Sequence, residues 1–80
     1  MSVKFYKTEN ESCIEILYEN HSAVVKEYLF NTCQHAHSDI LEECPSLNAA
    51  IEFAGDVYRI SREDEISSEE FAELVDTSFQ

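Results

Sequence analysis

The feature that most constrains the fold is a stretch in which apolar and polar residues alternate with a period of two. Within residues 12–19, Ile14, Ile16 and Tyr18 fall on one side of an extended chain, whereas Glu15 falls on the other. Alternation of this kind indicates a strand with one buried face. A single strand is not stable alone, so other segments of the chain must form strands that pair with this one.

Two neighbouring segments are candidates for those strands. Residues 2–8 mix β-branched, aromatic and lysine side chains, and the polar turn after them predicts an antiparallel hairpin with residues 12–19. Residues 23–30 are either a third strand or the start of a helix capped by Asn20 or Ser22. We favour the strand, because a two-stranded hairpin alone is only marginally stable.

The middle of the chain predicts two helices and a further strand. Residues 32–44 are expected to pass from a loop into a helix near 36–44, which Pro45 must end. Ser46 can cap a helix over 46–54, with Gly55 as the left-handed residue just past its end. Residues 56–61 then predict a short strand, with a continuing helix as the alternative.

The last helix has the clearest local signal. Ser67 is an N-cap candidate, Glu70 three residues later can close a capping box, and Ile66 and Phe71 can form a hydrophobic staple. These residues predict a charged connector over 62–65 followed by a helix over 67–76.

Together these elements predict one α+β domain spanning residues 1–80. A small antiparallel sheet of three or four strands, from 2–8, 12–19, 23–30 and 56–61, would be covered on one face by two or three helices. The sequence is 44% hydrophobic, with aromatic residues spread along its length. One core drawing on the whole chain is therefore expected.

The charge of the chain is extreme and uneven. Five Lys and Arg residues oppose seventeen Asp and Glu residues, for a formal net charge of −12. Residues 1–38 carry a net charge of −2 and residues 39–80 a net charge of −10. Such a field attracts a basic partner and is repelled by nucleic-acid phosphates and anionic lipid, so no direct nucleic-acid or membrane binding is expected.

The acidic residues expected to contact a partner lie in the C-terminal half. On the helical side of the sheet they would form one continuous negative surface. The candidate contacts are Glu42, Glu43, Glu63, Asp64, Glu65, Glu69, Glu70, Glu73 and Asp76.

The terminus, the apolar runs and the cysteines indicate where in the cell the protein is expected. The N-terminus has no apolar stretch typical of a signal peptide, and no apolar run approaches a membrane span. Three cysteines, an odd number, argue against a disulfide framework, so a reducing cytoplasm is expected.

No motif predicts catalysis or a cofactor. Cys33, His37 and Cys44 are the best candidates for a zinc site, but their spacing departs from the usual structural patterns. A reactive thiolate needs an electropositive setting, which this chain lacks. One glycine cannot build a phosphate-binding loop, and no calcium-loop pattern is present. We therefore expect a non-enzymatic protein without metal or cofactor.

In size, acidity and lack of catalytic motifs, the chain resembles small phage-encoded anti-defence proteins, including anti-CRISPR proteins and other DNA mimics. The resemblance implies an inhibitor that blocks DNA engagement by a CRISPR effector complex in a bacterial host. The alternatives are an immunity protein or antitoxin that neutralises a basic toxin, a zinc-stabilised adaptor, and a domain whose acidity serves only solubility. Either a monomer or a homodimer is compatible with the sequence, and Tyr28 or Phe30 on an edge strand could support the homodimer.

Overall fold

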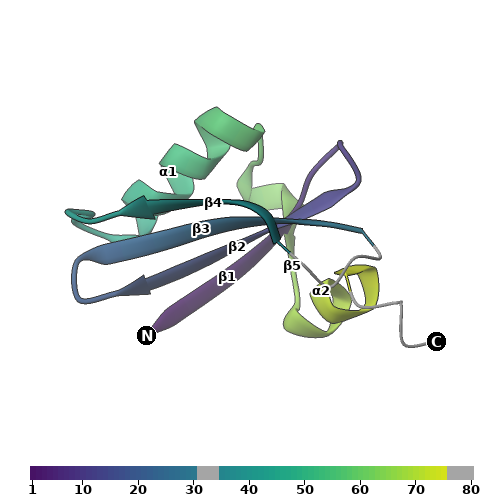
Figure 1. The fold of residues 1–80 in the computed structure, drawn as a ribbon, viewed down its shortest axis with the longest axis horizontal. Coiled ribbons are helices and arrows are strands. Elements are labelled where there is room, and N and C mark those ends of the chain that lie inside the picture. The colour runs from purple at the N-terminus through teal and green to yellow at the C-terminus, as the bar shows by residue number, and fades with distance from the viewer. Residues whose placement is uncertain (31–34, 76–80) are drawn as a thin grey trace.

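A five-stranded antiparallel sheet with two helices forms the fold (Figure 1). The structure is a computed structural model that describes residues 1–30 and 35–75. The strands follow the order β4-β3-β2-β1-β5 across the sheet. The architecture confirms the predicted α+β class. In chain order the elements are β1 (Ser2–Lys7), β2 (Ser12–Glu19), β3 (Ser22–Leu29), β4 (His35–Leu41), α1 (Leu47–Tyr58), a 3-10 turn (Arg62–Asp64), β5 (Glu65–Ile66) and α2 (Ser68–Val75).

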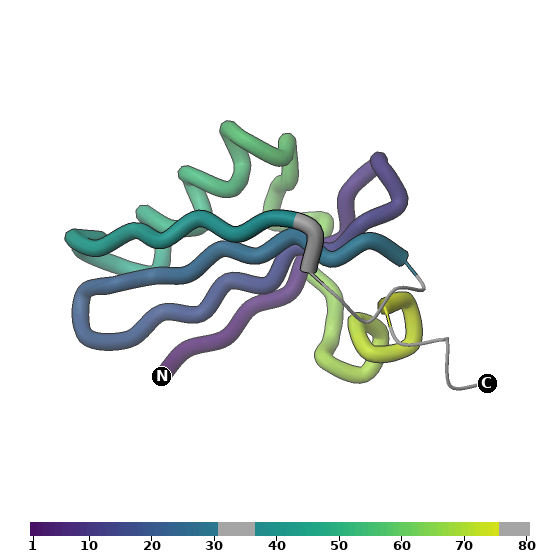
Figure 2. Tube along the Cα trace, in the orientation of Figure 1, coloured from purple at the N-terminus to yellow at the C-terminus, as the bar shows by residue number. Residues whose placement is uncertain are grey.

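The two helices lie on opposite faces of the sheet, which differs from the expected covering of one face. Ile14, Ile16 and Val25 are buried on one face together with Ala50 and Ala54 of α1. Because side chains alternate along a strand, Phe5 projects from the other face, where its ring stacks on Phe71 of α2. Figures 1 and 2 show α1 running along the strands and α2 at one end of the sheet, near β5.

The prediction of a strand over 23–30 is confirmed, but the helix predicted near 36–44 is wrong. This segment forms β4, in which Ile40 pairs with Val24 and Asp39 pairs with Val25. His37, Ser38 and Asp39 are weak helix formers. If this segment were a helix, β3 would be an edge strand with unpaired backbone N–H and C=O groups. Pairing of β4 with β3 satisfies these groups, so the tertiary structure favours a strand here.

The strand predicted over 56–61 is also wrong, and the alternative of a continuing helix is correct. Ser46 caps α1 as predicted, because its Oγ accepts a hydrogen bond from the Ala49 N–H at 3.2 Å. However, α1 passes through Gly55 and ends at Tyr58, and the left-handed residue is Arg59 (φ 58°, ψ 42°). A Cβ on Gly55 would lie 3.1 Å from the Ile60 carbonyl oxygen, so glycine allows a close approach of the returning chain.

Arg59 adopts a left-handed conformation at the C-terminus of α1, where glycine is usually found. Its N–H donates to the Gly55 carbonyl at 2.9 Å, which is the usual hydrogen bond of a helix C-terminus with glycine at this position. We expect Arg59→Gly to raise the free energy of unfolding by about 0.5–1 kcal/mol, because glycine adopts this conformation without steric cost. Urea denaturation measures the change. Asp56→Gly, inside α1, is the control and should destabilise the fold by about 0.3 kcal/mol, the difference in helix propensity between the two residues. An unchanged or lower stability of Arg59→Gly would contradict the prediction.

Candidate partner-binding surface

The acidic helix α2 begins as the sequence predicts. The Glu70 N–H donates to Ser67 Oγ at 3.1 Å, which makes Ser67 the N-cap of a helix that starts at Ser68. Glu69 and Glu70 lie in its first turn, where the helix dipole favours negative charge. Local sequence chemistry therefore fixes both where the helix begins and where its carboxylates lie.

Phe71 attaches α2 to the sheet. Its ring stacks on Phe5 with the centroids 4.4 Å apart and meets the Tyr28 ring edge-on at 5.2 Å. Val75 at the end of the helix is buried. Aromatic pairs of this geometry add about 0.5–1.5 kcal/mol each beyond the burial of apolar area. The carboxylates of α2 are therefore carried on a helix with a fixed position.

Cys13 is fully buried in β2 on the face that α2 covers. Burial raises the pKa of its thiol to about 11, a value that includes an opposing effect of Lys7 and a smaller raising effect of Glu70. The side chain is therefore a neutral thiol near pH 7 and packs as a small hydrophobic group.

Three glutamates of α2 form what we call the α2 acidic surface, namely Glu69, Glu70 and Glu73. All three are exposed. Glu73 follows Glu69 by one turn, so the carboxylates share one side of the helix, opposite Phe71. Within residues 1–30 and 35–75, Lys4 forms an ion pair with Glu65 and His37 contacts Asp39, and neither contact includes a residue of this surface.

Two other predicted contacts are engaged within the fold. Asp64 Oδ2 accepts the Ser61 N–H at 2.9 Å and the Ser61 hydroxyl at 3.3 Å, which closes the 3-10 turn. Glu65 forms an ion pair with Lys4, with 3.1 Å between Oε2 and Nζ. Both carboxylates therefore hold this connector in place, and they are less available to a partner than Glu63, which is exposed.

The predicted continuous acidic surface is wrong. Glu42 and Glu43 directly follow β4, where the Cys44 N–H donates to the His21 carbonyl at 2.8 Å. This contact places them beside the β2–β3 turn, at the end of the sheet away from α2 (Figure 1). The prediction fails because residues 35–41 form a strand, and this strand runs towards the end of the sheet that is opposite to α2. Asp76 lies outside the described residues.

The fold adds an acidic residue that sequence reasoning missed. Glu9, in the β1–β2 turn, lines a shallow depression with Glu63 and Asp64, beside Lys7. Only the pairing of β5 with β1 brings the two segments together, and no local pattern indicates it. The depression therefore places a further carboxylate, that of Glu9, near Glu63 and Asp64.

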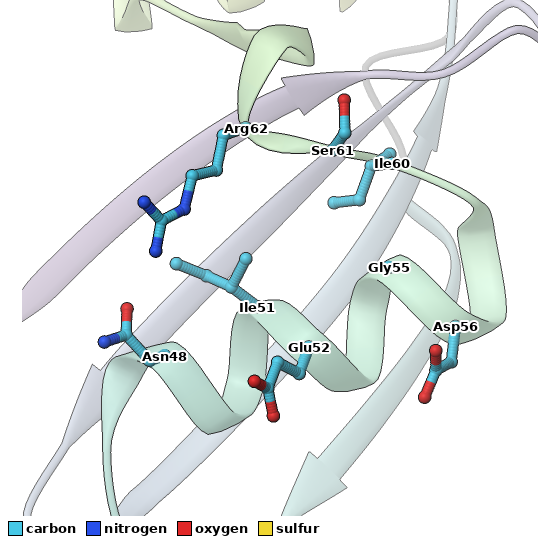
Figure 3. Close-up of a pocket in the computed structure, with 8 residues that line it drawn as sticks. All are labelled: Asn48, Ile51, Glu52, Gly55, Asp56, Ile60, Ser61 and Arg62. Carbon is cyan, nitrogen blue, oxygen red and sulfur yellow. The ribbon is translucent and has the colours of Figure 1, made fainter.

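A larger open depression lies between α1 and the chain that follows it (Figure 3). Glu52 and Asp56 project from one side of α1, and the Arg62 guanidinium reaches in from the 3-10 turn. Ile51 and Ile60 form its apolar part. With carboxylates and a guanidinium on an open, exposed rim, this depression of about 560 Å³ adds acidic residues to the outer surface.

The structure does not bring the predicted zinc ligands together. Cys33 lies outside the described residues. Cys44 is buried and its Sγ donates to the Ser46 carbonyl at 3.1 Å, whereas His37 lies earlier in β4 and contacts Asp39. Within residues 1–30 and 35–75 no group of three His, Cys, Asp or Glu side chains could hold a metal ion.

Comparisons with protein-family models, curated proteins and solved structures found no match. Neither helix in the described part of the chain is both long and apolar enough to span a bilayer.

Proposed function

We propose that this protein is a non-enzymatic acidic inhibitor whose α2 acidic surface occupies the basic nucleic-acid-binding groove of a partner. The observation that carries the proposal is a helix anchored by Phe71 with three exposed glutamates on its outer side. In the most specific form, the protein is of the anti-CRISPR type, acts in the bacterial cytoplasm and blocks DNA engagement by a CRISPR effector complex.

The spacing of the carboxylates suits this role. One helical turn advances about 5.4 Å, and successive phosphates on one DNA strand advance about 3.4 Å along the axis. Glu69 and Glu73 are one turn apart. Because successive phosphates are displaced around the DNA axis as well as along it, they are separated by a similar distance, so the two carboxylates can occupy successive phosphate positions in a basic groove. Arginine side chains there would bind them through charge-assisted hydrogen bonds. The net charge of −12 would also speed the encounter.

Charge reversal of the α2 acidic surface tests the proposal. The tagged protein is first used to recover its partner from host lysate at low and high salt, with and without competing DNA. We expect the variant Glu69→Lys, Glu70→Lys, Glu73→Lys to lose binding by at least about a hundredfold, because three attractive contacts become repulsive. A partner that both salt and DNA displace would support the mimic.

A matched control separates position from net charge. The variant Glu19→Lys, Glu42→Lys, Glu43→Lys changes the net charge equally at the opposite end of the sheet and should retain binding within a few-fold. Equal losses in both variants would show that net charge alone matters, and unchanged binding in the α2 variant would contradict the proposal. A single small partner that DNA does not displace would instead favour the immunity protein or antitoxin.

A further inference from the structure

An apolar row crosses the sheet on the face that α2 covers only at one end. Val3, Leu17, Val24 and Ile40 are direct cross-strand partners in β1, β2, β3 and β4. Val3 is 39% exposed and Ile40 is 68% exposed, whereas Leu17 and Val24 are half-buried. We call these four side chains the apolar row. A contiguous apolar strip of this kind on a highly charged protein marks a contact surface.

Charged residues of both signs lie beside the apolar row, although most of the molecule is acidic. On the α2 side, the next row of the same face contains Glu15, Lys26 and Ser38, and on the other side are Glu19 and Ser22. Lys26 is the only Lys or Arg between Lys7 and Arg59. The single base of this long segment therefore borders the apolar row, with an acid beyond the opposite border.

We propose that the apolar row is the contact surface of a homodimer, in which two sheets pack face to face about a two-fold axis running along the row. Such a rotation lays the row on itself and exchanges its two borders. Lys26 of each copy then lies over Ser22 of the partner subunit, beside Glu19 of the partner subunit. Lys26 also lies between that carboxylate and its own cross-strand neighbour Glu15, whose Oε1 accepts the Tyr28 hydroxyl at 3.3 Å.

The position of α2 selects this axis. Sheets packed face to face are about 10 Å apart, which leaves no room for a helix between them. An axis parallel to the strands would place each α2 between the two sheets. An axis along the row places each α2 beyond the β2–β3 turn of the partner, where the sheet has ended. The arrangement also leaves the α2 acidic surface accessible, so it does not depend on the proposed function.

The dimer should be weak and should strengthen with salt. A single row of four side chains with its borders is smaller than a standard interface, so association is expected in the micromolar to millimolar range. Each copy carries a net charge of −12, and salt screens the repulsion between copies. Binding of a basic partner would weaken with salt, so the two interactions respond in opposite directions and can fail independently.

Sedimentation equilibrium over a concentration and salt series tests the dimer. Ile40→Thr keeps a β-branched residue in β4 and should raise the dissociation constant about tenfold, since each dimer loses the apolar side chain twice. Val57→Thr is the matched control, because Val57 is 51% exposed on α1, away from the row, and its substitution should leave the constant unchanged. A strictly monomeric protein at every concentration and salt, or equal effects of the two variants, would overturn the proposal.

A charge exchange identifies the second copy as the occupant. Lys26→Glu should weaken the dimer, and Glu19→Lys added to it should restore the association. Within one chain the two positions are four residues apart along paired strands, about 13 Å, which is too far for an ion pair. Rescue would therefore support a contact between copies, and no rescue in a variant that folds normally would overturn the proposed axis.

Discussion

Replacing Phe71 with alanine is expected to release α2 from the sheet and to lower the free energy of unfolding by about 2–3 kcal/mol. The ring is half-buried, so the loss is smaller than the ~3–5 kcal/mol typical of a fully buried phenylalanine. Its contacts with Phe5 and Tyr28 are the ring contacts that attach the helix. An 80-residue domain is expected near the lower end of the usual ~5–15 kcal/mol, so this loss is a large fraction of its stability.

The same substitution should reduce partner binding more than the loss of stability explains, because the α2 acidic surface would no longer have a fixed position. Phe53→Ala is the control, since Phe53 is a half-buried ring on α1 that packs against the other face. Urea denaturation and binding are measured for both variants, with hydrogen exchange along α2. If Phe71→Ala left α2 protected from exchange, or weakened binding no more than Phe53→Ala, the anchoring role would be refuted.

The elements predicted correctly are those whose signal is local. The alternation around Ile14 and Ile16 requires a strand with one buried face, and the structure buries both residues completely. Serine before a helical pattern predicts a cap at Ser46 and Ser67, and in the structure each hydroxyl accepts a hydrogen bond from the N–H three residues ahead. Strand period and capping chemistry depend on a few neighbouring residues, so a single sequence is enough to predict them.

The incorrect predictions involve segments whose structure is decided by distant residues. The segment around Asp39 pairs with β3, and the Tyr58 hydroxyl of α1 donates to Asp39 Oδ2 at 3.1 Å. Neither partner is adjacent in the sequence. β5, with Glu65 and Ile66, becomes a strand only because β1 offers a free edge. No local pattern predicts pairings of this kind.

In the candidate site, too, some residues could be predicted from local pattern and others depend on the fold. The α2 acidic surface follows from helix periodicity, so Glu69, Glu70 and Glu73 could be predicted to lie together. The contribution of Glu9 and the separation of Glu42 from α2 depend on the topology of the sheet. The apolar row could not be predicted for a related reason, because Leu17 and Val24 become neighbours of Ile40 only when the strand order is known.

Stability is expected to fall steeply at alkaline pH, because buried acids of high pKa are neutral in the folded state. Burial raises the pKa of Cys13 from 9.0 to about 11. Burial and the hydrogen bond to Asp39 raise the pKa of Tyr58 from 10.0 to about 12. Burial also raises the pKa values of Tyr6 and Tyr28, with Glu65 and Glu15 respectively adding to the effect. All four shifts have the same direction and therefore act together.

The sign follows from linkage between ionisation and folding. A group whose pKa is higher in the folded state contributes stability in full below its unfolded pKa, and the contribution is lost as pH rises through the folded pKa. Stability is therefore lost between about pH 9, where Cys13 ionises in the unfolded chain, and about pH 12, where Tyr58 ionises in the folded chain. We call this range the alkaline window. Allowing for partial exposure of Tyr58, we expect a loss of about 3 kcal/mol across this window, measured by urea denaturation at successive pH values. Tyr58→Phe removes one titrating group, so its loss should be smaller above about pH 10. A stability that stayed level to the end of the window, or a Tyr58→Phe profile parallel to that of the unmodified protein, would show that these groups are not held neutral by the fold.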